Sequence, residues 1–168
     1  MCDKVEYIVI NYMVHMPTSF PPVVTTNDAI RRECRGIVFA PSGEVIARRY
    51  HKFFNINEKP ETQANLIDLS TPHVLFDKMD GSMITPMLIN GTIRWGTKMG
   101  LTDVGDSAEK FVEVNPKYNE FAKFCIDTGH TPIFEWCSRK NRIVLDYSVD
   151  NLVLTAIRNI ETGEYLHI

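Results

Sequence analysis

Residues 83–95 read MITPMLINGTIRW and carry a strong local signal for an antiparallel hairpin. The pair Asn90-Gly91 suits a two-residue turn in which both residues take positive φ angles. Apolar and β-branched residues, which pack well in strands, flank this pair on both sides. We therefore predict two strands, 83–89 and 92–95, joined by this turn.

Similar runs of strand-forming residues, separated by turn residues, occur along most of the chain. Pro41-Ser42-Gly43 is one such turn and predicts a second hairpin between strands at 34–40 and 44–50. Further single strands are predicted at 5–10, 74–78, 131–137, 142–145 and 152–158. The region 17–27, rich in Pro, Ser and Thr, is predicted to be a loop, and 161–164 a turn.

One helix is well marked by its ends. Asn115 is a suitable N-cap, Pro116 fits the first helical position, and Thr128-Gly129 ends the helix. A shorter helix is predicted at 106–112. One or two helices packed on strands that short turns join place the chain in the α+β class, with mostly antiparallel sheets.

The composition is that of an ordinary globular protein, with 168 residues, 44% of them hydrophobic and 23% charged. This length predicts one domain with a sizeable core. No run approaches the ~20 apolar residues of a membrane span, and the N-terminus lacks the layout of a signal peptide, so we expect a cytoplasmic location. The net charge of −3 argues against nucleic-acid binding by overall charge and leaves room only for a local basic groove. The cysteines and histidines show no metal-ligand spacing, so no metal site is predicted among them.

Lys78-Met79-Asp80-Gly81-Ser82 is the segment with the clearest chemical meaning. Its glycine lets the backbone lie close to whatever the lysine attacks. A lysine amine is protonated at neutral pH, so a site that uses one as a nucleophile must lower its pKa with nearby cations or by desolvation. The pattern alone also occurs in ordinary surface turns. The candidate cations are Arg35, Lys52 and Lys98, which would also stabilise a phosphate under attack.

In order and spacing, the segments of this chain resemble the phage T4-type RNA ligase 1 family. Residues 78–82 resemble the nucleophile motif that RNA ligases share with DNA ligases and capping enzymes. The segments that resemble the RNA ligase family in particular are 33–39, 52–58, 95–98, 134–136, 141–145 and 154–165. The resemblance runs from about Glu33 to Tyr165, which is most of the chain.

The resemblance implies an ATP-grasp-like nucleotidyltransferase domain of an ATP-dependent RNA ligase that acts in RNA repair. Lys78 would attack the α-phosphate of ATP, release pyrophosphate and become a lysyl-AMP. The AMP would pass to an RNA 5′-phosphate, and the 3′-hydroxyl of a second RNA end would displace it. Mg²⁺ would screen the phosphates. A phage-like origin, and with it the cytoplasm of a host, is implied in the same way.

The resemblance also implies roles for individual residues. Asp80 and Gly81 would shape the nucleophile loop. Glu135 would accept hydrogen bonds from the ribose hydroxyls, unless it is an ordinary charge at the sheet surface. Arg35 and Lys52 would orient the triphosphate.

Lys98, by the same resemblance, would contact phosphate or ribose, and Phe54 or Trp136 would pack near the nucleotide. Ordinary structural roles stay open beside these. Lys52 would then be a surface lysine, the aromatic residues would belong to the core, and Arg158 would pair with a nearby acid.

The chain departs from the family pattern after Glu135. The family's catalytic domain continues with a metal-binding carboxylate motif and a Lys-x-Lys motif, followed by an RNA-specificity domain, and we find none of these in residues 1–168. We therefore expect a single, incomplete adenylyltransferase domain. It would be a fragment, a split-gene product completed by a second polypeptide, or a natural short form. By itself it should adenylate Lys78 slowly or not at all.

Two other functions stay open. One is a shortened module that binds ATP or RNA ends without joining them. The other is a different covalent nucleotidyltransferase, namely a DNA ligase or a capping enzyme. The segments 52–55 and 141–145 favour an RNA ligase over this second alternative.

Overall fold

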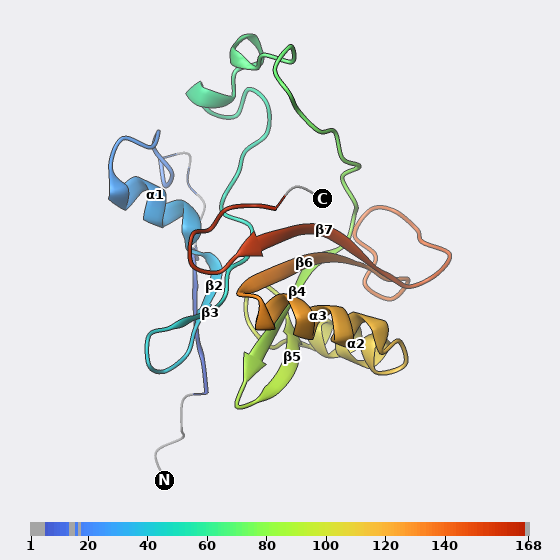
Figure 1. The fold of residues 1–168 in the computed structure, drawn as a ribbon. Helices are drawn as coiled ribbons and strands as arrows, with labels where there is room; N and C mark the ends of the chain where they lie inside the picture. The colour runs from blue at the N-terminus through green and yellow to red at the C-terminus, as the bar shows by residue number, and fades with distance from the viewer. Residues whose placement is uncertain (1–5, 14–15, 17, 167–168) are drawn as a thin grey trace.

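The protein contains two antiparallel sheets (Figure 1). The structure is a computed structural model that describes residues 6–13, 16 and 18–166. The smaller sheet has the strand order β1 (Ile8–Asn11), β2 (Arg35–Phe39), β3 (Val45–Ala47). The larger sheet has the order β5 (Thr92–Gly96), β4 (Ser82–Ile89), β6 (His130–Cys137), β7 (Asn151–Asn159). The prediction of an α+β fold with mostly antiparallel sheets is therefore confirmed.

Helices cover one face of the larger sheet. The helical elements are α1 (Thr26–Glu33), the short 3₁₀ turns η1 (Pro60–Thr62) and η2 (Ala64–Leu66), α2 (Asp103–Glu113) and α3 (Lys117–Asp127). Figure 1 shows α2 and α3 side by side against that face, with α1 beside the smaller sheet. Within the described part of the chain, no helix combines the length and the apolar composition needed to cross a membrane.

The main core fills the space between α2, α3 and the larger sheet. Trp95, Phe134 and Trp136 of the sheet are buried there against Ala108 of α2 and Ala122 of α3. Small helical residues let the helices approach large rings, and burying each ring stabilises the fold by roughly 2–3 kcal/mol. These contacts hold β4, β5 and β6 in a fixed relation to one another.

The hairpin predicted from residues 83–95 is confirmed as β4 and β5. Asn90 and Gly91 have φ angles of 49° and 79°, and Ile89 pairs with Thr92 across the turn. Both central residues thus take the positive φ angles that this turn requires. Four other predicted strands, at 34–40, 44–50, 131–137 and 152–158, are confirmed as β2, β3, β6 and β7, although β3 is shorter than predicted.

The N-terminal strand and the helix starts differ slightly from the prediction. The strand expected at 5–10 appears as β1, later in the chain, and Val5 lies outside the described residues. Helix α2 begins earlier than predicted because Thr102 caps it through the Gly105 N–H at 3.3 Å. The side chain of Asn115 donates to the Phe111 carbonyl instead of capping α3.

Two predicted strands are wrong. Residues 74–78 form no strand, and Val74, Leu75 and Phe76 are exposed. Residues 142–145 form no strand either, and the N–H groups of Val144 and Leu145 donate to the Asp80 carboxylate instead of to a neighbouring strand. β-Branched and aromatic residues favour strands only where a partner strand and a packing surface are available.

Helix α1 was not predicted, because its first residues fall in the region 17–27 that we expected to be a loop. Its start nevertheless has a local signal. Thr25 accepts a hydrogen bond from the Asp28 N–H, and the Asp28 carboxylate accepts one from the Thr25 N–H at 2.9 Å. This reciprocal pair is a capping box with aspartate in the third helical position.

Partly buried ion pairs join α1 to residues of both sheets. Glu33, at the end of α1, contacts Arg158 of β7 at 2.6 Å and Arg48, just after β3, at 3.2 Å. The guanidinium of Arg158 also donates to the carbonyls of Arg49 and Gly163. The ordinary structural role for Arg158, pairing with an acid, is confirmed.

Removing the Glu33 carboxylate should therefore destabilise the fold, because it leaves the buried Arg158 guanidinium without its counter-charge. We expect Glu33→Ala to lower the free energy of unfolding by about 2 kcal/mol, less than for a fully buried pair because Glu33 is partly exposed. Urea denaturation measures this change. The matched control Glu44→Ala, at an exposed position, should stay within about 0.5 kcal/mol. Equal stability of both variants would contradict the assignment.

Candidate functional site

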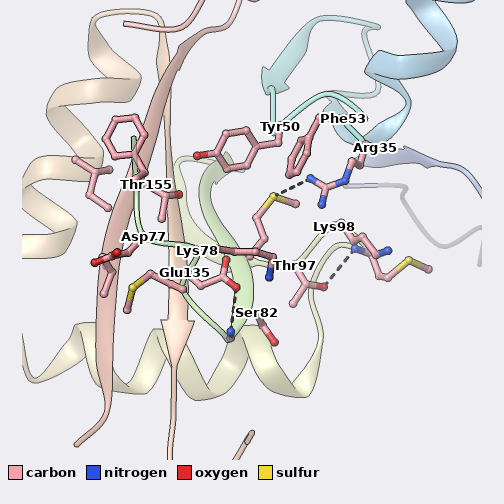
Figure 2. A pocket seen from close by; sticks show the side chains of 17 residues that line it. Arg35, Tyr50, Phe53, Asp77, Lys78, Ser82, Thr97, Lys98, Glu135 and Thr155 are labelled. Atoms are coloured by element: carbon pink, nitrogen blue, oxygen red, sulfur yellow. Dashed lines mark hydrogen bonds between the residues drawn. The ribbon is translucent and has the colours of Figure 1, made fainter. Parts of the chain in front are cut away.

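A cavity of about 970 Å³ opens between residues of both sheets (Figure 2). Its wall includes Arg35 of β2, Glu135 of β6 and residues 153–155 of β7. Residues 76–82, which we call the nucleophile loop after the nucleophile predicted at Lys78, and the turn 97–99 complete most of it. Four of the predicted site residues that carry charge therefore meet in one space, although they come from distant parts of the chain: Arg35, Lys78, Lys98 and Glu135.

Gly81 is the point where the nucleophile loop meets β6. Its N–H donates to Oε1 of Glu135 at 3.1 Å. A Cβ at this position would collide with the carbonyl oxygen of Trp136, so the approach requires glycine. The ladder of β4 with β6 begins at the next residue, where Ser82 pairs with Trp136. The glycine of the motif thus sets how closely Lys78 lies to Glu135.

Glu135 lies half-buried on β6 and faces the cavity. Burial raises the pKa of its carboxyl group, while the Gly81 N–H and the charges of Lys78 and Arg35 act in the opposite direction. Asp80 adds a smaller effect that raises the same pKa. Glu135 is therefore in electrostatic contact with both a cation of the nucleophile loop and a cation of β2.

Asp80 does not line the cavity. Its Oδ2 accepts hydrogen bonds from the N–H groups of Leu145 at 2.6 Å and Val144 at 2.7 Å. These bonds lower the pKa of the Asp80 carboxyl group, since they favour its charged form. The expectation that Asp80 shapes the nucleophile loop agrees with this position, because the residue anchors the loop from behind.

Arg35 and Lys98 reach the cavity from adjacent backbone segments. Gly36 has a φ of 83°, and a Cβ there would lie 2.6 Å from the carbonyl oxygen of Lys98. β2 and the turn 97–99 can pack this closely only because position 36 has no side chain. The guanidinium of Arg35 lies 5.3 Å from the ring centre of Phe53 and donates one N–H to the sulfur of Met83 at 3.6 Å, so two residues of the cavity wall hold it in place (Figure 2).

Besides Asp80, three more predicted site residues lie outside the cavity wall: Lys52, Phe54 and Trp136. The Nζ of Lys52 lies 4.3 Å from the ring centre of Phe54 and donates to the Phe53 carbonyl. Phe54 also contacts Phe20 edge to face. Trp136 is buried in the main core, where its ring lies 5.1 Å from that of Phe111. The structure therefore brings Lys78, Gly81, Lys98, Arg35 and Glu135 together and sets Asp80, Lys52, Phe54 and Trp136 apart from them.

The sequence did not indicate the apolar part of the wall. Tyr50, Phe53 and Leu154 lie there, with the Thr155 side chain beside Tyr50 (Figure 2). Tyr50 is packed between Phe53 and Tyr165, with ring centres at 5.9 Å and 5.8 Å. The predicted strands 44–50 and 152–158 contained Tyr50, Leu154 and Thr155, and the segment 52–58 contained Phe53. Only the pairing of strands decides which face of a strand meets the cavity.

The side chains that could bind a metal ion are scattered among the described residues. The described residues hold no group of three or more His, Cys, Asp or Glu side chains that could bind a metal by themselves. Cys2, His15 and His167, which the sequence analysis included, lie outside the described residues. Glu135 and Asp77 supply carboxylates at the cavity wall.

Comparison with known proteins identifies similar chains. A family model described as RNA ligase, of the phage T4 RNA ligase 1 type, matches residues 33–168. A putative RNA ligase of Thermovibrio ammonificans is 32% identical over 93% of the chain. A putative bifunctional polynucleotide kinase/RNA ligase of Autographa californica nuclear polyhedrosis virus is 26% identical over 99%, and RNA ligase 1 of bacteriophage TS2126 is 28% identical over 80%. The chain spans 41%, 27% and 36% of the length of these three relatives, respectively.

The charges around Glu135 predict opposite effects of two substitutions on its pKa. Lys78→Met removes a nearby cation and should raise the pKa of Glu135, while Asp80→Asn removes an anion and should lower it. Titration of glutamate carboxyl carbons by NMR measures both shifts. Lys110→Met, an exposed lysine on α2, should leave the Glu135 titration unchanged. Shifts of the same sign in the first two variants would contradict the arrangement.

Proposed function

The chain belongs to the RNA ligases of the phage T4 RNA ligase 1 type, and from this membership we propose that its cavity is the adenylation site of an ATP-dependent RNA ligase. The observation that carries the proposal is the convergence of Lys78, Arg35, Lys98 and Glu135 on one cavity. A nucleophile, two cations and a carboxylate are the groups needed to attack a phosphate and hold a nucleotide.

The proposed reaction begins at the amine of Lys78. A proton leaves the ammonium group for solvent, and Nζ attacks the α-phosphorus of ATP and loses a second proton to solvent as the new bond forms. A nitrogen–phosphorus bond forms while the phosphorus–oxygen bond to the leaving pyrophosphate breaks. Arg35 and Lys98, on the wall near Lys78, stabilise the negative charge that builds on the phosphates. The enzyme is left with AMP on Lys78.

The AMP then serves to activate RNA. An oxygen of an RNA 5′-phosphate attacks the phosphorus of the lysyl-AMP and releases the amine of Lys78. The 3′-hydroxyl of a second RNA end next attacks the activated 5′-phosphate, which forms a phosphodiester and releases AMP. The substrates in this proposal are ATP and two RNA ends.

The cavity suits ATP in size and in chemistry. A volume of about 970 Å³ lies at the upper end of the range for small-molecule sites. The Glu135 carboxylate is placed to accept hydrogen bonds from ribose hydroxyls. Tyr50, Phe53 and Leu154 offer an apolar surface for the base. Lys52, Phe54 and Trp136, which lie off this wall, have no part in the proposal.

Mg²⁺ fits the proposal as an ion that the phosphates and the protein hold together. Mg²⁺ commonly binds one or two protein carboxylates together with substrate phosphates and water. Asp77 is the carboxylate that the cavity wall supplies for this purpose, since Glu135 is assigned to the ribose. When bound, the ion neutralises phosphate charge during the attack.

A second polypeptide is not part of the proposal. Each similar relative is one longer polypeptide whose own chain contains the matching region, so the comparisons lend no support to a site split between two chains.

The proposal predicts a covalent protein–AMP adduct. Incubation of the full-length protein with Mg²⁺ and ATP labelled at its α-phosphate should give an acid-stable labelled protein. Lys78→Ala should abolish the label, whereas Lys110→Ala should retain it. A labelled Lys78→Ala protein would contradict the assigned nucleophile, and no label on the wild-type protein would leave only a binding module.

Substrate tests separate the ligases from their relatives. We expect unlabelled ATP, but not GTP, to compete for labelling, since preference for GTP would indicate a capping enzyme. We expect single-stranded RNA ends to be joined in preference to nicked DNA, and the reverse would indicate a DNA ligase.

A further inference from the structure

Residues 138–150, which we call the β6–β7 segment, lie against the back of the nucleophile loop. The segment contains residues 142–145, which we expected to be a strand, and the proposed reaction gives it no role. Ile143, Val144 and Leu145 expose their side chains, whereas Tyr147 is half-buried. Because the residues around it are exposed, the partial burial of Tyr147 indicates that its side chain contacts another part of the protein.

Hydrogen bonds join the segment and the nucleophile loop in both directions. The Asp80 carboxylate accepts from the N–H groups of Val144 at 2.7 Å and Leu145 at 2.6 Å. In return, the N–H of Asp80 donates to the hydroxyl oxygen of Tyr147 at 3.0 Å. Bonds to a charged acceptor are the stronger kind of hydrogen bond, so this reciprocal set is a firm attachment.

Tyr147 also connects the loop to β6. Its hydroxyl interacts with the thiol of Cys137, at the end of β6 and two residues after Glu135. Burial raises the pKa of this thiol, and the interaction with Tyr147 has a smaller effect that lowers it. The next amide of the loop, that of Gly81, donates to Glu135 itself. Two consecutive amides of the nucleophile loop are thus fixed by groups that β6 carries or contacts.

Lys78 depends on these bonds because the chain before it provides little support. Residues 73–80 form neither helix nor strand, and Leu75 and Phe76 are exposed. The nearest ladder begins only at Ser82. The backbone direction at Lys78 is therefore set largely by what holds Asp80 and Gly81, and small errors in the position of a nucleophile cost a large part of its rate.

We propose that Tyr147 is a positioning residue for Lys78, and that the β6–β7 segment aims the nucleophile through the Tyr147 hydroxyl and the amides of Val144 and Leu145. The proposal rests on the proposed function, since it concerns the rate at which Lys78 becomes adenylated. It gives the exposed segment 141–145 a backbone role that its apolar side chains do not suggest.

The charges of the segment favour this role over direct contact with RNA. Two of the three cations in residues 138–150 are matched by neighbouring acids: Arg139 pairs with Asp150 at 3.2 Å, and Arg142 pairs with Asp146 at 3.5 Å. The third is the exposed Lys140. A surface that binds phosphate groups needs cations that are not already matched by neighbouring carboxylates. RNA contact is nevertheless a distinguishable outcome of the experiments below.

The first test removes one hydroxyl. Tyr147→Phe should lower the rate of Lys78–AMP formation at saturating ATP about three- to ten-fold, the effect of one lost hydrogen bond. The KM for ATP should stay within about two-fold, because the residue does not touch the cavity, and Tm should stay within about 2 °C. The control Tyr118→Phe removes a hydroxyl that contacts Asn151 and should match the wild-type protein.

The outcomes of this test are separable. An unchanged rate in Tyr147→Phe, or an effect on KM alone, overturns the positioning role. If the wild-type protein itself forms no adduct, the proposed function fails. If the wild-type protein reacts and Tyr147→Phe reacts equally well, only the present inference fails.

The second test separates backbone from side chain at one position. Val144→Pro removes the N–H that donates to the Asp80 carboxylate, and it should slow adduct formation at least as much as Tyr147→Phe. Val144→Ala keeps the N–H and should react like the wild-type protein. An equal loss in both variants, or a loss in Val144→Ala confined to transfer of AMP to RNA, would show that the segment acts through its side chains and would overturn the proposal.

Discussion

The pairing of β4 with β6 starts at Ser82 opposite Trp136, and the position of Lys78 follows from that start. Gly81 comes immediately before it and lies against the Trp136 carbonyl, where no side chain fits. The same close approach lets the Gly81 N–H reach Glu135. Had the register of β4 against β6 slipped by one residue, the side chains of β4 would have exchanged faces, and Gly81 would no longer lie at the Trp136 carbonyl. The cavity thus depends on one steric constraint at the edge of a ladder.

The opposite wall of the cavity depends on buried cations. Arg49 is 1% exposed, and it donates to the Gly36 carbonyl of β2 and to the Thr85 hydroxyl of β4. Burial lowers its pKa to about 9, so it still carries its charge at neutral pH. Arg158, paired with Glu33, links α1 to β7. A buried guanidinium is costly to desolvate and is tolerated only when its N–H groups are hydrogen-bonded. Arg49 and Arg158 therefore bind polar groups of several elements and connect those elements.

The nucleophile loop combines a rigid end with an irregular one. On its C-terminal side, the β4 ladder and the bonds of Asp80 and Gly81 fix the backbone. On its N-terminal side, residues 73–80 leave the regular structure and expose apolar side chains. This asymmetry suits the proposed role of Lys78, since the backbone that carries the lysine is held on one side while the residues before it form no regular structure.

Local signals in the sequence determined the elements that need no distant partner. Asn90-Gly91 defined the β4–β5 hairpin, Thr25 and Asp28 contained the start of α1, and the order of motifs from Glu33 to Tyr165 indicated the RNA ligase family that the family model confirms. Arg35, Lys78, Lys98 and Glu135 could be named from those motifs, but only the tertiary structure placed them on one cavity.

Only the tertiary structure also decided that Trp136 lies in the core, that Tyr50 faces the cavity, and that 142–145 give their amides to Asp80 rather than to a strand. The physical reason is that a capped helix or a tight turn is stabilised by residues a few positions apart. The face of a strand, and the partner of a backbone amide, depend on segments far away in the chain.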